Sequence, residues 1–433
     1  MSVNVAIVGS GPSAFYTAEA LIKLDMNIRI DMIERLPTPF GLIRGGVAPD
    51  HQSTKRVARA YEKTALCEPF HFYGNVTVGK DISLSELRRL YDAVVLAVGM
   101  PRDQPLEIPG ADKNNVLGSA EFVGWYNGLP EFRELNPHLE TTTVAVIGNG
   151  NVALDIARVL VKTETEMATS DIVDYAAKAI RSSSLTDIHT FGRRGPIECK
   201  FTNVELREMG NLEDCTPVVD AAQLPIELPV DLSERDRRLK EKNLSNFREF
   251  STFNPLSKSK RVHFQFYANP VEILGAESVE GLKLERTQVI DKHATGTGEF
   301  FEIACGLVVY AIGYAAEPMD GVRFDARAGT VANTGGRIDD GLYAVGWIKR
   351  GPTGVIGTNK HDGDAIATQI YMDVPTGKKP GREALEKLFR KHGVRAVSYA
   401  EWQKIDSVEI GAAPPGAPRK KFVTVDEMLK VLS

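Results

Sequence analysis

The sequence predicts an α/β fold with two Rossmann-like dinucleotide-binding domains, the second inserted into the first. Two observations support this prediction: a unit of strand, glycine turn and helix begins at residue 3, and a second such unit begins at residue 143. The length of 433 residues agrees with two or three domains at ~150 residues each. We expect segments 1–103 and 320–433 to form the first domain and 104–319 the second.

The first unit is built from short segments with different apolar spacing. Residues 3–8 form a β-branched apolar run, which predicts a buried strand, and residues 9–12 form a glycine turn. Residues 13–24 carry an apolar stripe with helical spacing, and a second strand is expected at 28–33. Strand, turn, helix and strand within so few residues are typical of one βαβ unit.

The chemistry of this first unit follows from its glycines and its last residue. Gly9 and Gly11 allow the backbone to approach a pyrophosphate at the N-terminus of a helix. Ala14 replaces the third glycine and is still small, while Glu34 can accept hydrogen bonds from a ribose with a free 2′-hydroxyl. The alternative is a tight turn followed by an exposed glutamate.

The second unit has the same order of elements but a different last residue. A strand at 143–147 leads into Gly148, Gly150 and a helix, and a strand at 187–191 follows a polar insertion at 163–186. Arg193 and Arg194 stand where the acidic residue would be, and paired guanidinium groups suit a 2′-phosphate. The unit is therefore expected to bind NADP, unless the arginines only form a solvated basic turn.

Two further apolar runs, 93–99 and 307–313, end in similar turns and are expected to be the crossovers between the two units. The proline-rich stretch 217–229 is expected to be a surface loop. A flavin nucleotide together with NADPH explains the two unlike sites better than two nicotinamide nucleotides do. Hydride transfer from NADPH to a flavin requires both cofactors on one chain, whereas two nicotinamide sites would have no such chemistry.

Composition excludes several other classes of protein. The 52 basic and 57 acidic residues give a net charge of −5, so no general affinity for nucleic acid is indicated. The four cysteines include no Cys-x-x-Cys pair, so neither a zinc ribbon nor a vicinal dithiol redox pair is expected. No apolar run reaches the ~20 residues of a transmembrane helix, and we expect a cytoplasmic protein.

Longer motifs add a resemblance to a known family. They are LPTPFGLIR at 36–44, GGVAPDH at 45–51, GRRGP at 192–196, FT at 201–202, ELRE at 205–208 and VGWIKRGPTGVIGTN at 345–359. With these motifs the chain resembles the adrenodoxin reductase family of FAD-dependent ferredoxin–NADP reductases, from residue 3 to roughly residue 425. The resemblance implies a glutathione-reductase-like architecture and electron transfer from NADPH through FAD to an iron–sulfur ferredoxin.

The resemblance also implies roles for individual residues. FAD would contact Ser13, Glu34, Leu42, Val78, Trp347, Gly354, Val355 and Ile356, and NADP would contact Asn149, Gly150, Asn151, Val152, Arg193, Arg194 and Glu205. His51 and Asp155 would lie near the flavin as catalytic candidates. The alternatives are a loop histidine and a first-turn aspartate that the helix dipole favours.

A ferredoxin is typically acidic, so its docking surface on the reductase is expected to be basic. Residues 234–261 contain nine basic and four acidic side chains, and we expect docking near Arg235, Arg237 and Arg238. The alternative is an ordinary solvated helix face. Two other functions remain open: a module like the β-subunit of glutamate synthase, and a non-catalytic dinucleotide sensor.

Overall fold

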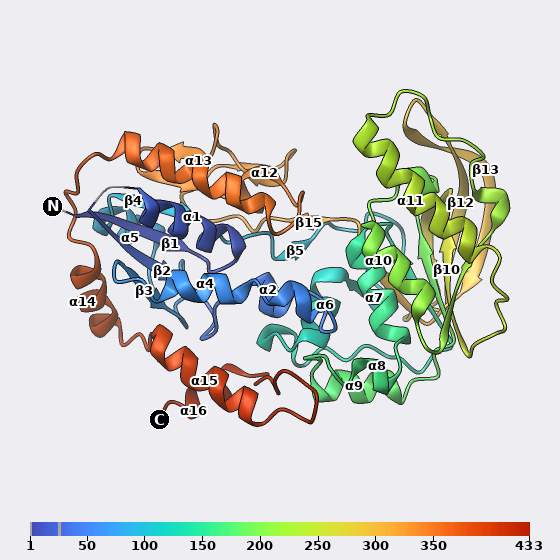
Figure 1. Ribbon diagram of the computed structural model, residues 1–433, viewed down its shortest axis with the longest axis horizontal. Helices are drawn as coiled ribbons and strands as arrows, with labels where there is room; N and C mark the ends of the chain where they lie inside the picture. Colours follow the sequence, from blue (N-terminus) through green and yellow to red (C-terminus); the bar gives the residue numbers. More distant parts are fainter. Residues whose placement is uncertain (1, 25–26) are drawn as a thin grey trace. The chain divides into compact units, whose positions relative to one another are not determined.

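The computed structural model describes residues 2–24 and 27–433. The chain divides into two units, each with its own sheet (Figure 1). Unit 1 comprises Met1–Arg102, Asn127–Pro130 and Gly313–Ser433, and unit 2 comprises Asp103–Tyr126 and Glu131–Ile312. The boundary expected after residue 103 falls after Arg102, the one expected after residue 319 falls after Ile312, and Asn127–Pro130 joins unit 1.

The sheet of unit 1 is parallel except at one edge. In spatial order its strands are β18 (Arg337–Asp339), β19 (Leu342–Ala344), β4 (Ala93–Leu96), β1 (Val3–Val8), β2 (Ile28–Ile33) and β3 (Phe70–Tyr73). Only β18 pairs antiparallel, with β19. The register places Val5 of β1 beside Ile30 of β2 and Ala93 of β4, so the central strand is paired on both sides and buried throughout.

Helices cover both faces of this sheet, and alternate strand residues face the two apolar clusters. The first cluster joins α1 (Pro12–Lys23), α4 (Ala58–Ala65), α13 (Thr358–Asp373) and α15 (Tyr399–Gly411) to one face. The second joins α5 (Leu84–Leu90) and α14 (Arg382–His392) to the other. The shorter helices of the unit are α2 (Leu42–Gly45), α3 (Gln52–Lys55), α12 (Trp347–Arg350) and α16 (Val425–Lys430).

In the sheet of unit 2, neighbouring strands all pair in parallel, as expected for a second dinucleotide-binding unit. The order is β6 (Val116–Gly118), β14 (Leu307–Tyr310), β7 (Thr143–Ile147), β8 (Asp187–Phe191), β10 (Lys260–Gln265) and β9 (Cys215–Val219). Helix α7 (Asn151–Val161) packs against β7, β8 and β10. The remaining helices of this part of the chain are α6 (Ser119–Asn127), α8 (Glu164–Met167), α9 (Asp174–Arg181), α10 (Asn203–Glu208) and α11 (Glu234–Phe250).

Two features of unit 2 differ from the sequence-based expectation. Pro217 belongs to β9, so the expected loop at 217–229 is wrong at its first residues. β9 is an edge strand, where a residue without an N–H group costs no ladder hydrogen bond. The sequence also did not predict the antiparallel sheet formed by β11 (Ala268–Leu274), β12 (Gly281–Ile290) and β13 (His293–Ala304).

Candidate functional site

The glycine turn of unit 1 forms a loop that only small residues permit. Gly9 has a φ of +99°, and a methyl group built on it would lie 2.5 Å from the carbonyl oxygen of Ala97. A methyl group on Gly11 would meet nothing within 4 Å, so the backbone at Gly11 borders open space. Gly11 is the N-cap of α1 and supplies no side-chain cap. The loop therefore leaves room for an anionic group at the N-terminus of α1.

Glu34 holds this loop from the end of β2. It is 8% exposed, and its Oε2 accepts hydrogen bonds from the backbone nitrogen (3.0 Å) and the hydroxyl (2.6 Å) of Ser10. Its Oε1 accepts a bond from the Leu36 nitrogen at 3.1 Å. A carboxylate offers about four acceptor positions, so Glu34 keeps capacity for a ribose hydroxyl.

The segment that carries Leu42 packs against the same glycine turn. Gly41 has a φ of +47°, and a methyl group on it would lie 2.9 Å from the Gly11 Cα. Leu42 follows as the first residue of α2 and is 44% exposed. The structure thus brings Leu42 beside the glycine loop, although the two are distant in sequence.

Ser13, in the first turn of α1, lies next to the turn that precedes Trp347. A methyl group on Gly346 would lie 2.6 Å from the Ser13 hydroxyl, and Trp347 is the next residue. Asp362 of α13 fixes this turn, because its Oδ2 accepts a hydrogen bond from the Gly346 nitrogen at 2.7 Å and pairs with Arg350. Asp362 could not be found from the sequence, since no periodic pattern connects it to Gly346.

Three further flavin candidates of unit 1, Val355, Ile356 and Val78, differ in exposure and in the side of the sheet on which they lie. Val355 is 64% exposed, and its nitrogen donates to the Thr358 hydroxyl at 3.1 Å. Ile356 packs against the cluster that contains α1. Val78 packs against the cluster on the opposite face of the sheet, next to Ile82.

The glycine turn of unit 2 repeats this geometry. Gly148 has a φ of +143°, and a methyl group on it would lie 2.4 Å from the carbonyl oxygen of Ala311. Gly150, the N-cap of α7, faces open space and supplies no side-chain cap. Both units therefore place a carbonyl oxygen under the first glycine and leave the second glycine open.

Asn149 carries an acceptor that lacks a partner among the described residues. Its side-chain Oδ1 is buried and makes no hydrogen bond within this part of the chain. Its carbonyl oxygen accepts a bond from the Lys200 nitrogen at 3.0 Å, and Asn151 Oδ1 accepts one from the Thr202 nitrogen at 2.9 Å. A buried acceptor without a donor is costly, so Asn149 suits a ligand that donates a hydrogen bond.

The stretch after Thr202 brings a further candidate to this loop. Glu205 lies in the first turn of α10 and accepts a hydrogen bond from the Thr202 hydroxyl. Val152 is the second residue of α7. The segment from Lys200 to Glu205 therefore lies along the second glycine loop.

Arg193 and Arg194 follow the end of β8, and their backbone is fixed. The Arg193 carbonyl accepts a bond from the Thr287 hydroxyl at 2.8 Å, and the Arg194 carbonyl accepts one from the Tyr267 nitrogen at 3.2 Å. Neither guanidinium group forms an ion pair with a described carboxylate. Two adjacent arginines on a fixed backbone can receive a phosphate dianion.

The two catalytic candidates belong to different units. His51 is the N-cap residue of α3 in unit 1. Asp155 lies one turn into α7 in unit 2, where its Oδ1 is 2.7 Å from Nη1 of Arg158, a side chain with no exposed surface. The partner that balances the Asp155 charge is therefore a buried arginine, and Asp155 lies beyond the first turn of α7, in which the helix dipole acts.

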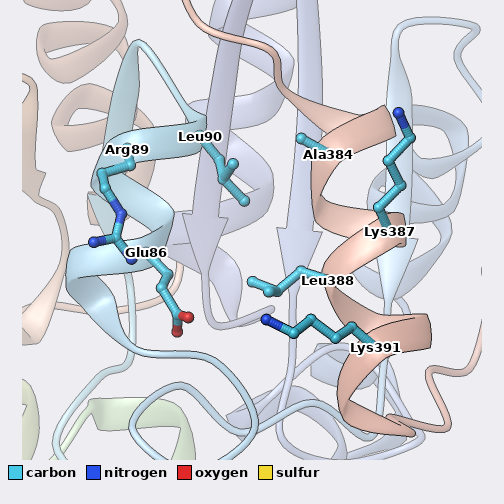
Figure 2. Close-up of a pocket in the computed structure, with 7 residues that line it drawn as sticks. All are labelled: Glu86, Arg89, Leu90, Ala384, Lys387, Leu388 and Lys391. Carbon is cyan, nitrogen blue, oxygen red and sulfur yellow. The ribbon is translucent and has the colours of Figure 1, made fainter.

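A surface groove lies elsewhere in unit 1, between α5 and α14 (Figure 2). Its walls combine Leu90, Ala384 and Leu388 with charged side chains. The charged lining residues are Glu86, Arg89, Lys387 and Lys391. None of them is a predicted cofactor residue.

Two further findings concern the cysteines and the length of the helices. Cys67, Cys199, Cys215 and Cys305 are all free thiols. Within the described ranges, no helix has the length and apolar character needed to cross a membrane.

Comparison with known proteins finds a matching family model, and relatives that match over nearly the full length of the chain. A family model described as pyridine nucleotide-disulphide oxidoreductase matches residues 3–185. The chain is 38% identical to the NADPH-ferredoxin reductase FprA of Mycobacterium tuberculosis, with 99% of this chain and 98% of that protein covered. It is also 38% identical to the mitochondrial NADPH:adrenodoxin oxidoreductase of Homo sapiens, covering 99% of this chain and 92% of that protein.

A solved structure matches over the same length. It is Mycobacterium tuberculosis FprA in complex with NADPH, with a TM-score of 0.95, 38% sequence identity and coverage of 100% of this chain and 99% of that chain.

Proposed function

We propose that unit 1 binds FAD and unit 2 binds NADP(H), because this chain belongs to the family of NADPH-ferredoxin and NADPH:adrenodoxin reductases. The protein is an FAD-dependent oxidoreductase that takes electrons from NADPH and passes them to an iron–sulfur ferredoxin. Bound FAD supplies the acceptance of hydride and the release of single electrons.

The observation that supports this division is the contrast between two loops of the same shape. Each has a glycine over a carbonyl oxygen and an open second glycine, but Glu34 follows the first and Arg193 and Arg194 follow the second. A carboxylate repels a 2′-phosphate and accepts from a free 2′-hydroxyl, whereas paired guanidinium groups attract the phosphate. FAD therefore fits unit 1, and NADP fits unit 2.

The residues of each site then have distinct tasks. In unit 1, the open backbone at Gly11 and the N-terminus of α1 hold the pyrophosphate, and Glu34 holds the ribose. In unit 2, Gly150 and the N-terminus of α7 receive the second pyrophosphate, and the buried Asn149 Oδ1 accepts a hydrogen bond from the nucleotide. His51 and Asp155 remain candidates for tuning protons near the reacting rings.

The docking surface for an acidic ferredoxin is proposed at the start of α11. Arg235 is exposed there, Arg237 donates to the Pro229 carbonyl oxygen at 2.8 Å, and Arg238 pairs with Glu234. Because Glu234 already balances Arg238, the charge available to a partner comes mainly from Arg235 and Arg237. The cytoplasmic location stays a prediction.

The experiment that tests the function measures ferredoxin-dependent reduction of cytochrome c by the purified holoenzyme. We expect turnover that requires ferredoxin and is faster with NADPH than with NADH. A protein that binds NADPH without any turnover would instead be a dinucleotide sensor.

A further inference from the structure

The segment that carries Leu42 is held on one side by the glycine loop. The Phe40 nitrogen donates to the Ser10 carbonyl oxygen at 3.1 Å, and a methyl group built on Gly41 would lie 2.9 Å from the Gly11 Cα. Phe40 has a φ of +84°, which is uncommon for a residue with a side chain. Such a conformation persists only where surrounding contacts enforce it.

Residues near the C-terminus form hydrogen bonds with the same segment through Arg44 of α2. Arg44 of α2 donates two hydrogen bonds to Glu409 of α15, at 2.8 Å to Oε2 and 2.5 Å to Oε1. Glu409 is 1% exposed, and the Arg44 guanidinium carbon lies 5.2 Å from the centre of the Trp402 ring. A bidentate pair with a stacked guanidinium fixes orientation as well as charge.

Lys421 adds a second contact with the same segment. Its ammonium group is buried, with the residue 7% exposed, and lies 3.4 Å from the Arg44 carbonyl oxygen and 3.0 Å from that of Asn127. The Phe422 nitrogen donates to Glu409 Oε1 at 2.8 Å, so Glu409 and Lys421 belong to one connected network.

Glu409 remains ionised in this buried position. Burial alone would raise its pKa, but the charge and hydrogen bonds of Arg44, with those of Phe422 and Arg419, lower the pKa below its ordinary value. A network of this kind is rigid when complete, and it loses much of its stability when one charged partner is neutralised.

We propose that Glu409 and Lys421 are positioning residues for FAD, which act by fixing α2 and thereby the place of Leu42 against the flavin. The proposal rests on the assignment of FAD to unit 1. Neither residue needs to touch the cofactor, because both act through Arg44. The C-terminal segment would then set the flavin environment, although no cofactor motif lies within it.

The test compares three holoenzyme variants. Glu409→Gln keeps the shape of the side chain but removes its charge, and Lys421→Met removes the buried ammonium. The control is Glu401→Gln, on the same helix. Its carboxylate pairs with Arg395 and bonds Ser398 in the N-terminal cap of α15, and among the described residues it bonds none of α2. Each variant is measured for FAD release after dilution, the visible circular dichroism of the bound flavin, the flavin midpoint potential and thermal unfolding.

We expect Glu409→Gln and Lys421→Met to raise the FAD dissociation constant roughly 10- to 100-fold and to change the flavin dichroism. Glu401→Gln is expected to change thermal unfolding alone. Wild-type affinity and dichroism in both test variants would overturn the proposal while leaving the FAD assignment intact. A wild-type protein purified without flavin would overturn both. If Glu409→Gln does not fold, Lys421→Met decides the outcome.

Discussion

Glu34 Oε2 accepts hydrogen bonds from both the backbone nitrogen and the hydroxyl of Ser10, at 3.0 and 2.6 Å. The carboxylate expected to bind a ribose therefore also shapes the loop expected to bind the pyrophosphate. The first prediction is that Glu34→Gln lowers both FAD affinity, roughly 10-fold, and the free energy of unfolding, by about 1–3 kcal/mol.

Titration of FAD release and chemical unfolding measure the two effects of Glu34→Gln. The control is Glu121→Gln, which removes a carboxylate that accepts from the Gly118 nitrogen at 2.7 Å in unit 2. Equal FAD affinity in the two variants would contradict the role of Glu34.

The second prediction separates folding from binding at the NADP loop. Gly150→Ala places a methyl group in open space, so the fold should be unaffected while the KM for NADPH rises about 10-fold or more because the pyrophosphate is crowded. Gly148→Ala brings a methyl group against the Ala311 carbonyl oxygen and should destabilise the protein. Thermal unfolding and NADPH kinetics distinguish the two, and an unchanged KM in Gly150→Ala would refute the assignment.

The third prediction concerns the choice of nucleotide. Replacing Arg193 and Arg194 by alanine should weaken NADPH binding roughly 10- to 100-fold and leave NADH kinetics nearly unchanged, because only NADPH carries the 2′-phosphate. Steady-state kinetics with both nucleotides measure the effect. Equal losses for NADPH and NADH would argue against a 2′-phosphate contact.

The fourth prediction tests the docking surface. The double variant Arg235→Glu and Arg237→Glu should raise the KM for ferredoxin about 10-fold at low salt and less at high salt, because screening weakens exposed charges. Lys387→Glu with Lys391→Glu provides the matched reversal in the groove of Figure 2. Ferredoxin kinetics that change only in the groove variant would place docking there instead.

The fifth prediction concerns acid stability. The rings of His189 and His263 stack at 4.3 Å, and His263 Nε2 lies 2.8 Å from Asp187 Oδ1. Burial, followed by the neighbouring His263, lowers the pKa of His189 from 6.5 to about 4. Between these values the unfolded chain binds a proton that the folded protein does not, so the free energy of unfolding should fall by up to about 3 kcal/mol as the pH drops through this window.

Chemical unfolding at several pH values measures this dependence. His189→Gln should flatten it, and His293→Gln on the exposed strand β13 should not. A pH dependence that is the same in both variants would show that another group is responsible.

The local parts of the fold were predictable from sequence. The strands at residues 3–8, 28–33, 143–147 and 187–191 have the predicted bounds. Those at 3–8 and 143–147 are short, mainly apolar runs that lead into a glycine turn, which is the sequence pattern of a buried strand. Pro217 was mistaken for a loop residue, because the sequence does not reveal which strand lies at the edge of a sheet.

The supporting contacts of the sites were not predictable from sequence. The carbonyl oxygens of Ala97 and Ala311 lie under the first glycines only because β4 and β14 pair beside β1 and β7. Asp362 and Glu409 act on segments that are distant in the chain, and no spacing rule connects them to those segments. Chemistry-bearing motifs are local, whereas the contacts that hold them are set by tertiary packing.

Anaerobic titration of the purified protein with NADPH is the decisive measurement for electron transfer from NADPH to ferredoxin. We expect a yellow protein whose flavin absorbance bleaches on addition of NADPH and returns when oxidised ferredoxin is added. A protein that carries no flavin, or whose flavin absorbance is unchanged by NADPH, would contradict it.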